Sequence, residues 1–236
     1  MFHDASTSLE PAPDAIPAAT VVILRDAPSG TEVLMLRRSS KLEFAGGMWV
    51  FPGGRVDAAD VLTDVDLTSI DAARRAAVRE AREESGLSLD EEQLVAISHW
   101  VPPAFNFKRF ATWFFVAPAP ADAHLAAADG SETTDHMWVT PTEAMARRDR
   151  GEIELAPPTW VTLHYIARAR DLAETLRHAA ASEPEYFTTQ FALYEDGRMA
   201  SLWQGDAAYG LEDPDTPGPR HRLWMSEEGW RYERGD

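Results

Sequence analysis

The first part of the chain alternates short apolar runs with turn residues, a pattern typical of paired strands. Residues 18–25 contain the run Val21-Val22-Ile23-Leu24, which predicts a buried strand. A turn at Pro28-Ser29-Gly30 leads into residues 32–38, which predict a second strand paired with the first as a hairpin. Residues 44–54 then hold a short apolar strand between two Gly-Gly pairs.

The pattern changes to a helical one after residue 68. Thr68 or Ser69 provides an N-terminal cap, the helix runs to about residue 85, and Gly86 stands where a helix ends. The rest of the chain predicts strands at residues 94–100, 111–117 and 136–139, a short helix opening at Pro141, the longest helix over residues 158–181, and short strands over residues 186–236.

Strands that alternate with helices predict an α/β fold in which helices pack on a mixed sheet. We divide the chain into three parts: residues 1–17 form a flexible N-terminal segment, residues 18–181 form the main domain, and residues 182–236 form a β-rich extension packed on it. Within the main domain, residues 57–70 are acidic and indicate a loop insertion.

Charge and composition narrow the function. The 22 Lys and Arg residues against 39 Asp and Glu give a net charge of −17, which repels nucleic-acid backbones and anionic membrane surfaces alike. The sequence has no cysteine, which excludes disulfides, thiolate nucleophiles and Cys-ligated metal sites. It has no apolar run of the roughly 18 residues that span a bilayer, and it begins without a signal pattern. We therefore expect a cytoplasmic protein that acts on a small molecule and binds neither nucleic acid nor membrane.

One segment carries acidic residues that helix stability does not explain. Residues 79–87 read REAREESGL, and steps of three and four residues place Glu80, Glu83 and Glu84 on one helix face. Like charges at these spacings cost about 0.2–0.5 kcal/mol each in helix stability. Because Mg²⁺ and Mn²⁺ prefer carboxylate oxygens, the cluster indicates a metal site. The alternative is a solvated acidic face whose surface ion pairs contribute little.

A glycine turn upstream adds a second side to this candidate site. Phe51-Pro52-Gly53-Gly54 lets backbone amides and carbonyls approach a metal ion or a phosphate. With both features, the chain resembles a Nudix hydrolase, whose box is a glycine, five residues, Glu, seven residues, then Arg-Glu-apolar-x-Glu-Glu-x-Gly-apolar. The second half of the box is complete from Arg79 onward. Counting back from Arg79 puts Asp71 at the first Glu, with an insertion of about eleven residues between Gly54 and Asp71.

The resemblance covers residues 18–181 and implies a Nudix-type α/β/α sandwich with a C-terminal helix and a β-rich tail. It also implies hydrolysis of the pyrophosphate bond of a nucleoside diphosphate linked to another group. The split box is similar to the branch of peroxisomal coenzyme A diphosphatases and their bacterial relatives, which favours coenzyme A or an acyl-CoA, although that branch has Arg where this chain has Glu43.

Two other functions stay open. An ADP-ribose or other dinucleotide diphosphatase is one, because Pro102 lies 15 residues after Leu87, near where that subgroup carries proline. A nucleotide-sensing Nudix-like module without turnover is the other, although such modules usually lose carboxylates of the box, and all three are present here.

The resemblance further implies roles for individual residues. Mg²⁺ or Mn²⁺ is the expected cofactor, and its expected ligands are Glu80, Glu83, Glu84 and the carbonyl oxygen of Gly54. The expected catalytic base is Glu83, Glu84 or the loop residue Glu132. Arg79 is expected to orient a glutamate through a bidentate pair.

The expected substrate contacts are positively charged or aromatic. Arg38, Lys108 and Arg109 are candidates for the substrate phosphates, and Phe51 is a candidate for stacking on a base. Each has an alternative: basic residues and loop acids such as Glu132 are commonly just exposed, and an aromatic residue beside a core strand is commonly just packed. The tryptophan-rich tail is expected to pack on the domain, to close over the pocket, or to form a homodimer contact.

Overall fold

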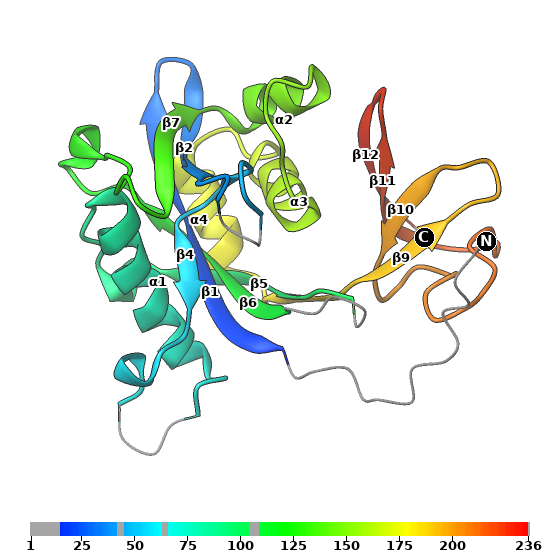
Figure 1. Ribbon diagram of the computed structural model, residues 1–236, viewed down its shortest axis with the longest axis horizontal. Helices are drawn as coiled ribbons and strands as arrows, with labels where there is room; N and C mark the ends of the chain where they lie inside the picture. Colours follow the sequence, from blue (N-terminus) through cyan, green and yellow to red (C-terminus); the bar gives the residue numbers. More distant parts are fainter. Residues whose placement is uncertain (1–14, 42–44, 63–65, 104–108, 236) are drawn as a thin grey trace.

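The computed structural model describes residues 15–41, 45–62, 66–103 and 109–235, which form two β-sheets and four α-helices (Figure 1). The larger sheet contains β1 (Ile16–Ala27), β2 (Gly30–Arg38), β3 (Trp49–Val50), β4 (Gly53–Arg55), β5 (Val95–Val101), β6 (Phe110–Pro118), β7 (Thr133–Val139) and β8 (Glu185–Thr188). The helices are α1 (Ile70–Ser85), α2 (Pro141–Asp149), α3 (Pro157–Ile166) and α4 (Leu172–Ala180). The smaller sheet contains β9 (Gln190–Leu193), β10 (Met199–Leu202), β11 (Arg220–Ser226) and β12 (Gly229–Gly235).

The larger sheet is mixed, as the alternation of strands and helices predicts. Its strand order is β3-β2-β1-β6-β5-β8, with β4 paired to β1 and β7 paired to β2. The predicted hairpin of β1 and β2 is confirmed as an antiparallel pair, and Gly30 at its turn has a φ of 111°, which favours glycine. The β1–β6 and β5–β8 pairs are parallel.

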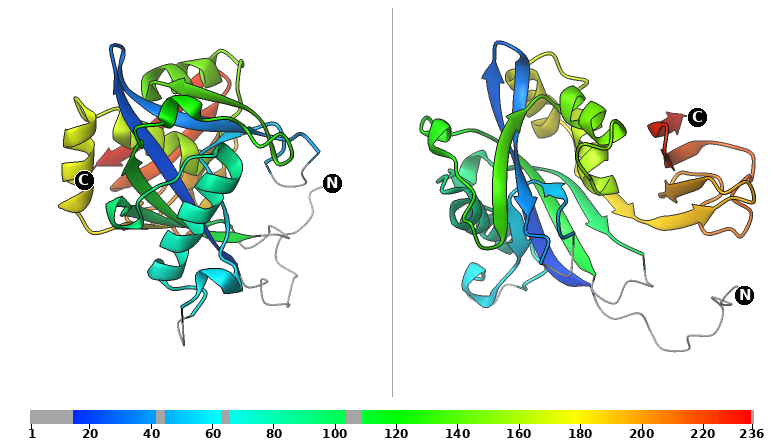
Figure 2. Two further views of the ribbon diagram at one scale, coloured as in Figure 1. Left: turned by 90° about the vertical axis from the view of Figure 1, so that its left-hand side faces the viewer. Right: turned by 45° about the horizontal axis from the view of Figure 1, so that its top comes forward.

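Helices cover both faces of the larger sheet, so the domain is an α/β/α sandwich (Figure 2). On one face, Val21 and Ile23 of β1 pack with the alanines of α1. On the other face, Val22 and Leu24 of the same strand pack with residues of α3. This alternation follows from the two-residue period of a strand and explains why the apolar run is continuous: both faces of β1 are buried.

The helix α1 begins and ends where the sequence predicts. The Ser69 side chain caps it by accepting a hydrogen bond from the Ala72 amide at 3.2 Å, and Gly86 follows its last residue with a left-handed φ of 74°. The prediction of one long helix over residues 158–181 is wrong, because this segment contains α3 and α4. The break occurs where the Asp171 side chain accepts from the Glu174 amide at 2.7 Å and starts a new helix.

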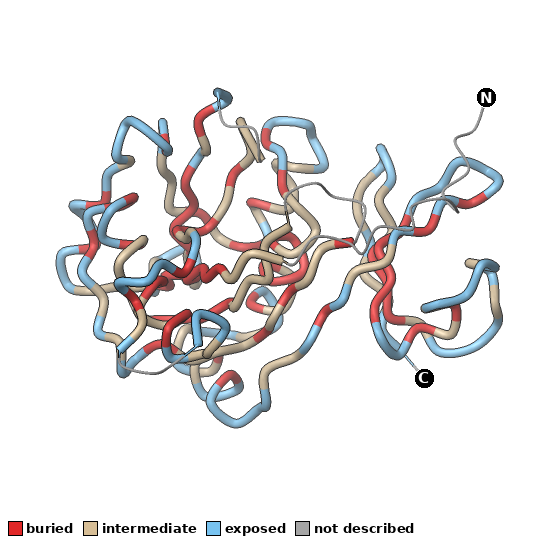
Figure 3. Tube along the Cα trace, turned by 60° about the horizontal axis from the view of Figure 1, so that its bottom comes forward, coloured by how far each residue is buried: buried red, intermediate tan, exposed pale blue. Residues whose placement is uncertain are grey.

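The C-terminal extension packs on the main domain. The chain passes from β8 in the larger sheet directly into β9 of the smaller one (Figure 1), and Trp203 and Leu223 are buried in the same core cluster as α3. Figure 3 shows buried stretches along the strands and exposed loops between them. In the described parts of the chain, none of the helices has the length and apolarity needed to cross a bilayer.

Candidate active site

The acidic segment lies on the last two turns of α1, which packs closely against the larger sheet. Small side chains make this close approach possible, because the buried face of α1 consists largely of Ala72, Ala73, Ala76, Ala77 and Ala81. Glu84 lies on the same face, next to the glycines at the start of β4. A carboxylate thus occupies a position that the helix otherwise fills with alanine.

Glu84 is a buried carboxyl group with only part of its hydrogen-bonding capacity used. Its side chain accepts a hydrogen bond from the Gly53 amide at 2.9 Å through Oε2, whereas the buried Oε1 has no hydrogen-bond partner among the described residues. Burial, together with the charges of Glu80 and Glu132, raises the pKa of Glu84 to about 8. The Gly53 hydrogen bond and the charge of Arg38 oppose this rise without cancelling it.

Gly53 and Gly54 lie so close to neighbouring atoms that a side chain at either position would clash. A Cβ atom on Gly54 would lie 2.3 Å from Oε1 of Glu80, and a Cβ atom on Gly53 would lie 2.4 Å from the carbonyl oxygen of Ala19. The glycine turn therefore brings backbone against both the sheet and the carboxylate of Glu80. Burial raises the pKa of Glu80, although its hydrogen bond from Arg79 at 2.8 Å lowers it in part.

Arg79 connects the acidic residues to one another. Its Nε and Nη2 donate to the two carboxylate oxygens of Asp60 at 3.0 and 2.8 Å, and its Nη1 donates to Glu80 at 2.8 Å and to Glu83 at 3.1 Å. Glu83 differs from its two neighbours in exposure, because 59% of its side chain is accessible. The predicted bidentate pair of Arg79 is thus present, but its partner is Asp60.

Asp60 is the acidic residue that sequence reasoning missed. Burial by itself would raise its pKa, but the hydrogen bonds and charge of Arg79 bring the pKa below its usual value. Five residues separate Gly54 from Asp60, which is the spacing of the first half of the box. Asp71, by contrast, pairs with Arg74 at 3.0 Å and has a side chain that is 64% exposed. The inserted residues therefore follow Asp60, and the assignment of Asp71 to the box is corrected.

The loop before β7 brings Glu132 near the acidic face of α1. The charge of Glu132 acts on both Glu80 and Glu84. The loop is organised by Asp129, which accepts hydrogen bonds from the amides of Glu132 at 3.1 Å and Thr133 at 2.7 Å. These bonds hold the pKa of Asp129 well below its usual range, against the opposing effect of burial. Glu132 itself is exposed.

The predicted substrate contacts have different outcomes. Arg38 lies at the end of β2, close enough to lower the pKa of Glu84, and its buried Nε has no hydrogen-bond partner in the described part of the chain. Arg109 lies at the start of β6, where its guanidinium donates to the Pro102 carbonyl oxygen at 3.1 Å. Lys108 falls outside the described residues.

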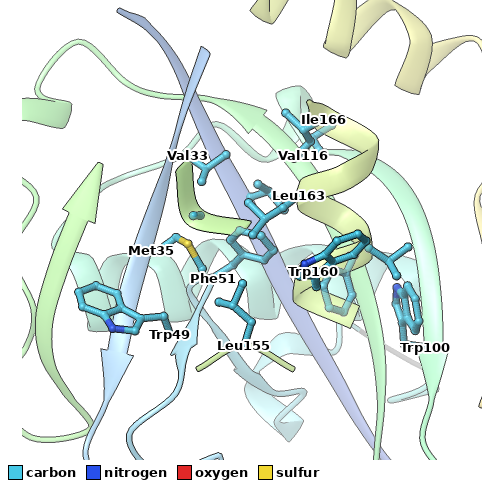
Figure 4. Close-up of a cluster of buried hydrophobic side chains, with 14 of the residues drawn as sticks. Val33, Met35, Trp49, Phe51, Trp100, Val116, Leu155, Trp160, Leu163 and Ile166 are labelled. Atoms are coloured by element: carbon cyan, nitrogen blue, oxygen red, sulfur yellow. The ribbon is translucent and has the colours of Figure 1, made fainter. Parts of the chain in front are cut away.

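Phe51 is a core residue in this structure. Only 3% of it is exposed, and its ring packs edge-on against Phe114 at 6.5 Å between centroids. Trp49 and Leu155 belong to the same cluster (Figure 4). The prediction that Phe51 stacks on a base is therefore corrected, since its ring is enclosed by other apolar side chains.

The residues present fit a divalent cation by their chemistry. In the described residues, His, Asp and Glu side chains form no ready-made group of three that could hold a metal ion. The acidic face nevertheless offers hard oxygen donors, and the buried Oε1 of Glu84 is an acceptor without a donor. Burial is the largest cause of the raised pKa values of Glu80 and Glu84, and a bound cation would favour their charged forms.

The known proteins that are similar to this chain belong to one family. The NUDIX domain profile matches residues 15–159. The acyl-coenzyme A diphosphatase NUDT19 of Xenopus laevis is 24% identical over 85% of this chain and 77% of its own length. The putative nudix hydrolase 7 of Caenorhabditis elegans is 25% identical over 59% of this chain and 57% of its own length. Among solved structures, a NUDIX hydrolase from Alicyclobacillus acidocaldarius is similar in fold, with a TM-score of 0.61, 23% identity, and coverage of 70% of this chain and 96% of that one.

Proposed function

This chain belongs to the NUDIX domain family and is a Nudix hydrolase, and we propose that it cleaves the pyrophosphate bond of coenzyme A or an acyl-CoA. The observation that carries the proposal is the similarity to an acyl-coenzyme A diphosphatase along most of both chains. The reaction adds the oxygen of water to one phosphorus while the bridging P–O bond breaks and a phosphomonoester leaves.

The divalent cation, Mg²⁺ or Mn²⁺, would be held by Glu80, Glu83, Glu84 and the Gly54 carbonyl oxygen. When bound, it would offset the charge that grows on the phosphate oxygens during cleavage. The chain itself positions these groups. Gly54 leaves the room that the Glu80 carboxylate requires, and the Gly53 amide binds one oxygen of Glu84 while the other has no donor among the described residues.

Arg79 acts on the carboxylates rather than on the substrate. Its hydrogen bonds to Asp60 fix the guanidinium, which in turn holds Glu80 and Glu83. The water proton is accepted by a carboxylate, for which Glu132, Glu83 and Glu84 are the candidates. Glu132 is favoured because it lies near the other acids, and Arg79 does not bind it.

Arg38 and Arg109 are proposed to contact the substrate phosphates. Arg38 is the better supported of the two, because its guanidinium lies near Glu84 with an unused Nε donor. A positive group beside the carboxylates is needed in a protein with a net charge of −17, since the substrate is itself anionic.

A substrate panel tests the proposal. Coenzyme A, acetyl-CoA, ADP-ribose, NADH and diadenosine tetraphosphate are each incubated with the enzyme and Mn²⁺, and the products are identified by mass. We expect adenosine 3′,5′-bisphosphate from coenzyme A or acetyl-CoA, with a kcat/KM about tenfold or more above that for the other compounds. A preference for ADP-ribose would contradict the substrate assignment and leave the hydrolase intact, whereas no cleavage of any compound would favour a sensing module.

A further inference from the structure

A cavity separate from the acidic residues of α1 lies on the opposite face of the larger sheet. Its volume is about 180 Å³, and its walls come from α3, α4, β5, β8 and β12. Figure 1 shows α3 between the larger sheet and the red strands β11 and β12, so the cavity lies where the C-terminal extension meets the main domain. The acidic residues of α1 and the glycine turn do not line it.

The inner wall of this cavity is apolar and aromatic. Trp100 and Phe187 stack on each other at 3.8 Å between ring centroids and form part of the wall, together with Ile97 and Val161. The rings of His164 and Tyr232, 5.5 Å apart between centroids, line it from α3 and β12. Such a wall binds a flat apolar group better than it binds water.

The two arginines that line the cavity differ in whether an acidic side chain pairs with them. Arg234 lines the cavity but already donates to Glu185 at 2.6 Å, so these two charges offset each other. Arg168 is exposed and lies two residues after the end of α3, and its guanidinium has no ion-pair partner in the part of the chain that the structure describes. Its charge acts on His164, Tyr165 and Tyr232, which places it toward the aromatic wall.

Glu183 is the remaining charged residue of the lining, and it is exposed. It is not among the groups that shift His164 or Tyr165, whereas Arg168 acts on both. Burial and the charge of Arg168 lower the pKa of His164. Of the two arginines that line the cavity, Arg168 is the one that is not paired with Glu185.

We propose that this cavity binds a small carboxylate with one aromatic ring, with the carboxylate on Arg168. The size argument is direct: an apolar protein cavity of about 150 Å³ holds one benzene molecule. A cavity of about 180 Å³ has room for a ring and a short acidic arm. The site would make the junction between the domain and its extension responsive to a small metabolite, independently of the substrate at the acidic site.

Phenylacetate and its neutral isostere phenylacetamide are the probes for a test by calorimetry and ligand-observed NMR on the full chain. We expect phenylacetate to bind with a Kd of about 1 mM or tighter. Phenylacetamide should bind about tenfold more weakly, because it lacks the charge-assisted pair with the guanidinium. The Arg168→Gln variant should lose this preference, and the control Arg177→Gln, on an exposed side chain of α4, should keep it.

Two further variants locate the site. Ala179→Leu fills the cavity from α4 and should abolish binding of both probes, whereas Glu84→Gln, at the acidic site, should bind phenylacetate as the parent does. If Ala179→Leu does not fold, Arg168→Gln still decides the outcome. Equal affinity for the two probes, unchanged binding by Arg168→Gln, or no binding at 10 mM would overturn the proposal.

Discussion

Glu84 and Asp206 are buried to the same extent, 4% and 5% exposed, yet the chain treats them in opposite ways. Asp206 accepts hydrogen bonds from the amides of Ala208 and His221 at 2.9 Å each and from two nitrogens of Arg222. Burial would raise its pKa, but these bonds lower it. Glu84 receives one backbone hydrogen bond, and its pKa rises to about 8.

The difference separates a structural carboxylate from a functional one. In the C-terminal extension, the buried Arg222 donates two hydrogen bonds to Asp206 and offsets its charge. The Asp206 carboxylate therefore needs no ligand. At the end of α1, the positive charge of Arg79 is directed to Asp60, Glu80 and Glu83, and Glu84 is left without it. A buried carboxyl group with an acceptor oxygen that no donor uses indicates a binding site.

The largest expected effect is that of Glu84→Gln on turnover. Removing the charge of a cation ligand should lower kcat by about a thousandfold or more, because the metal supplies several kcal/mol of transition-state stabilisation. The fold should persist, since glutamine can still accept from the Gly53 amide. Steady-state kinetics and a melting curve measure both, with the exposed Glu92→Gln as control; parent-like turnover would remove Glu84 from the site.

Asp206→Asn should lower the stability of the fold and leave turnover unchanged. Loss of the carboxylate leaves Arg222 buried and unpaired, which should lower the free energy of unfolding by about 3–5 kcal/mol. Chemical denaturation measures this, with the exposed Glu227→Gln as control. Turnover per folded molecule should match that of the parent. A loss of turnover at full stability would show that the pair belongs to the active site. It would contradict the distinction between a structural Asp206 and a functional Glu84.

Asp60→Asn tests the corrected box. Without its bidentate partner, Arg79 should hold Glu80 and Glu83 less firmly, and kcat/KM should fall about 10- to 100-fold, as for other residues that orient metal ligands. Asp71→Asn is the matched control and should leave kcat/KM unchanged, because the exposed Asp71 pairs with Arg74 and not with Arg79. The reverse result would restore the assignment of Asp71.

The smallest expected effect is on the pH dependence of stability without metal. Because the pKa of Glu84 is raised from 4.5 to about 8, the folded protein keeps a proton that the unfolded chain releases. This contribution is complete below pH 4.5 and is lost as the pH rises through 8. In EDTA, the free energy of unfolding of the parent should therefore fall more steeply than that of Glu84→Gln between pH 5 and pH 8. Parallel pH profiles would contradict the raised pKa.

Local sequence signals predict much of the fold. The β1–β2 hairpin and α1 follow from apolar runs, a serine cap and a terminal glycine, all of which act within a few residues. The break between α3 and α4 does not follow from periodicity, because it depends on Asp171 preferring to cap a helix over continuing one.

The site could be predicted in part for the same reason. The three glutamates lie on one helix, and their spacing is a local property. The Asp60–Arg79 pair spans 19 residues, including the inserted segment, so counting back from Arg79 misses Asp60, whereas counting forward from Gly54 over five residues reaches it. Asp206 and Arg222 look like ordinary surface residues in the sequence, because their burial depends on how the smaller sheet folds. The burial of Phe51 likewise depends on packing against β6 and α3.

Anomalous diffraction from crystals soaked in Mn²⁺ tests the central claim most directly. The account predicts a manganese peak within bonding distance of Oε1 of Glu84, and no such peak in Glu84→Gln crystals soaked in the same way. A parent crystal with no peak at Glu84, or with manganese bound only at other carboxylates, would contradict it.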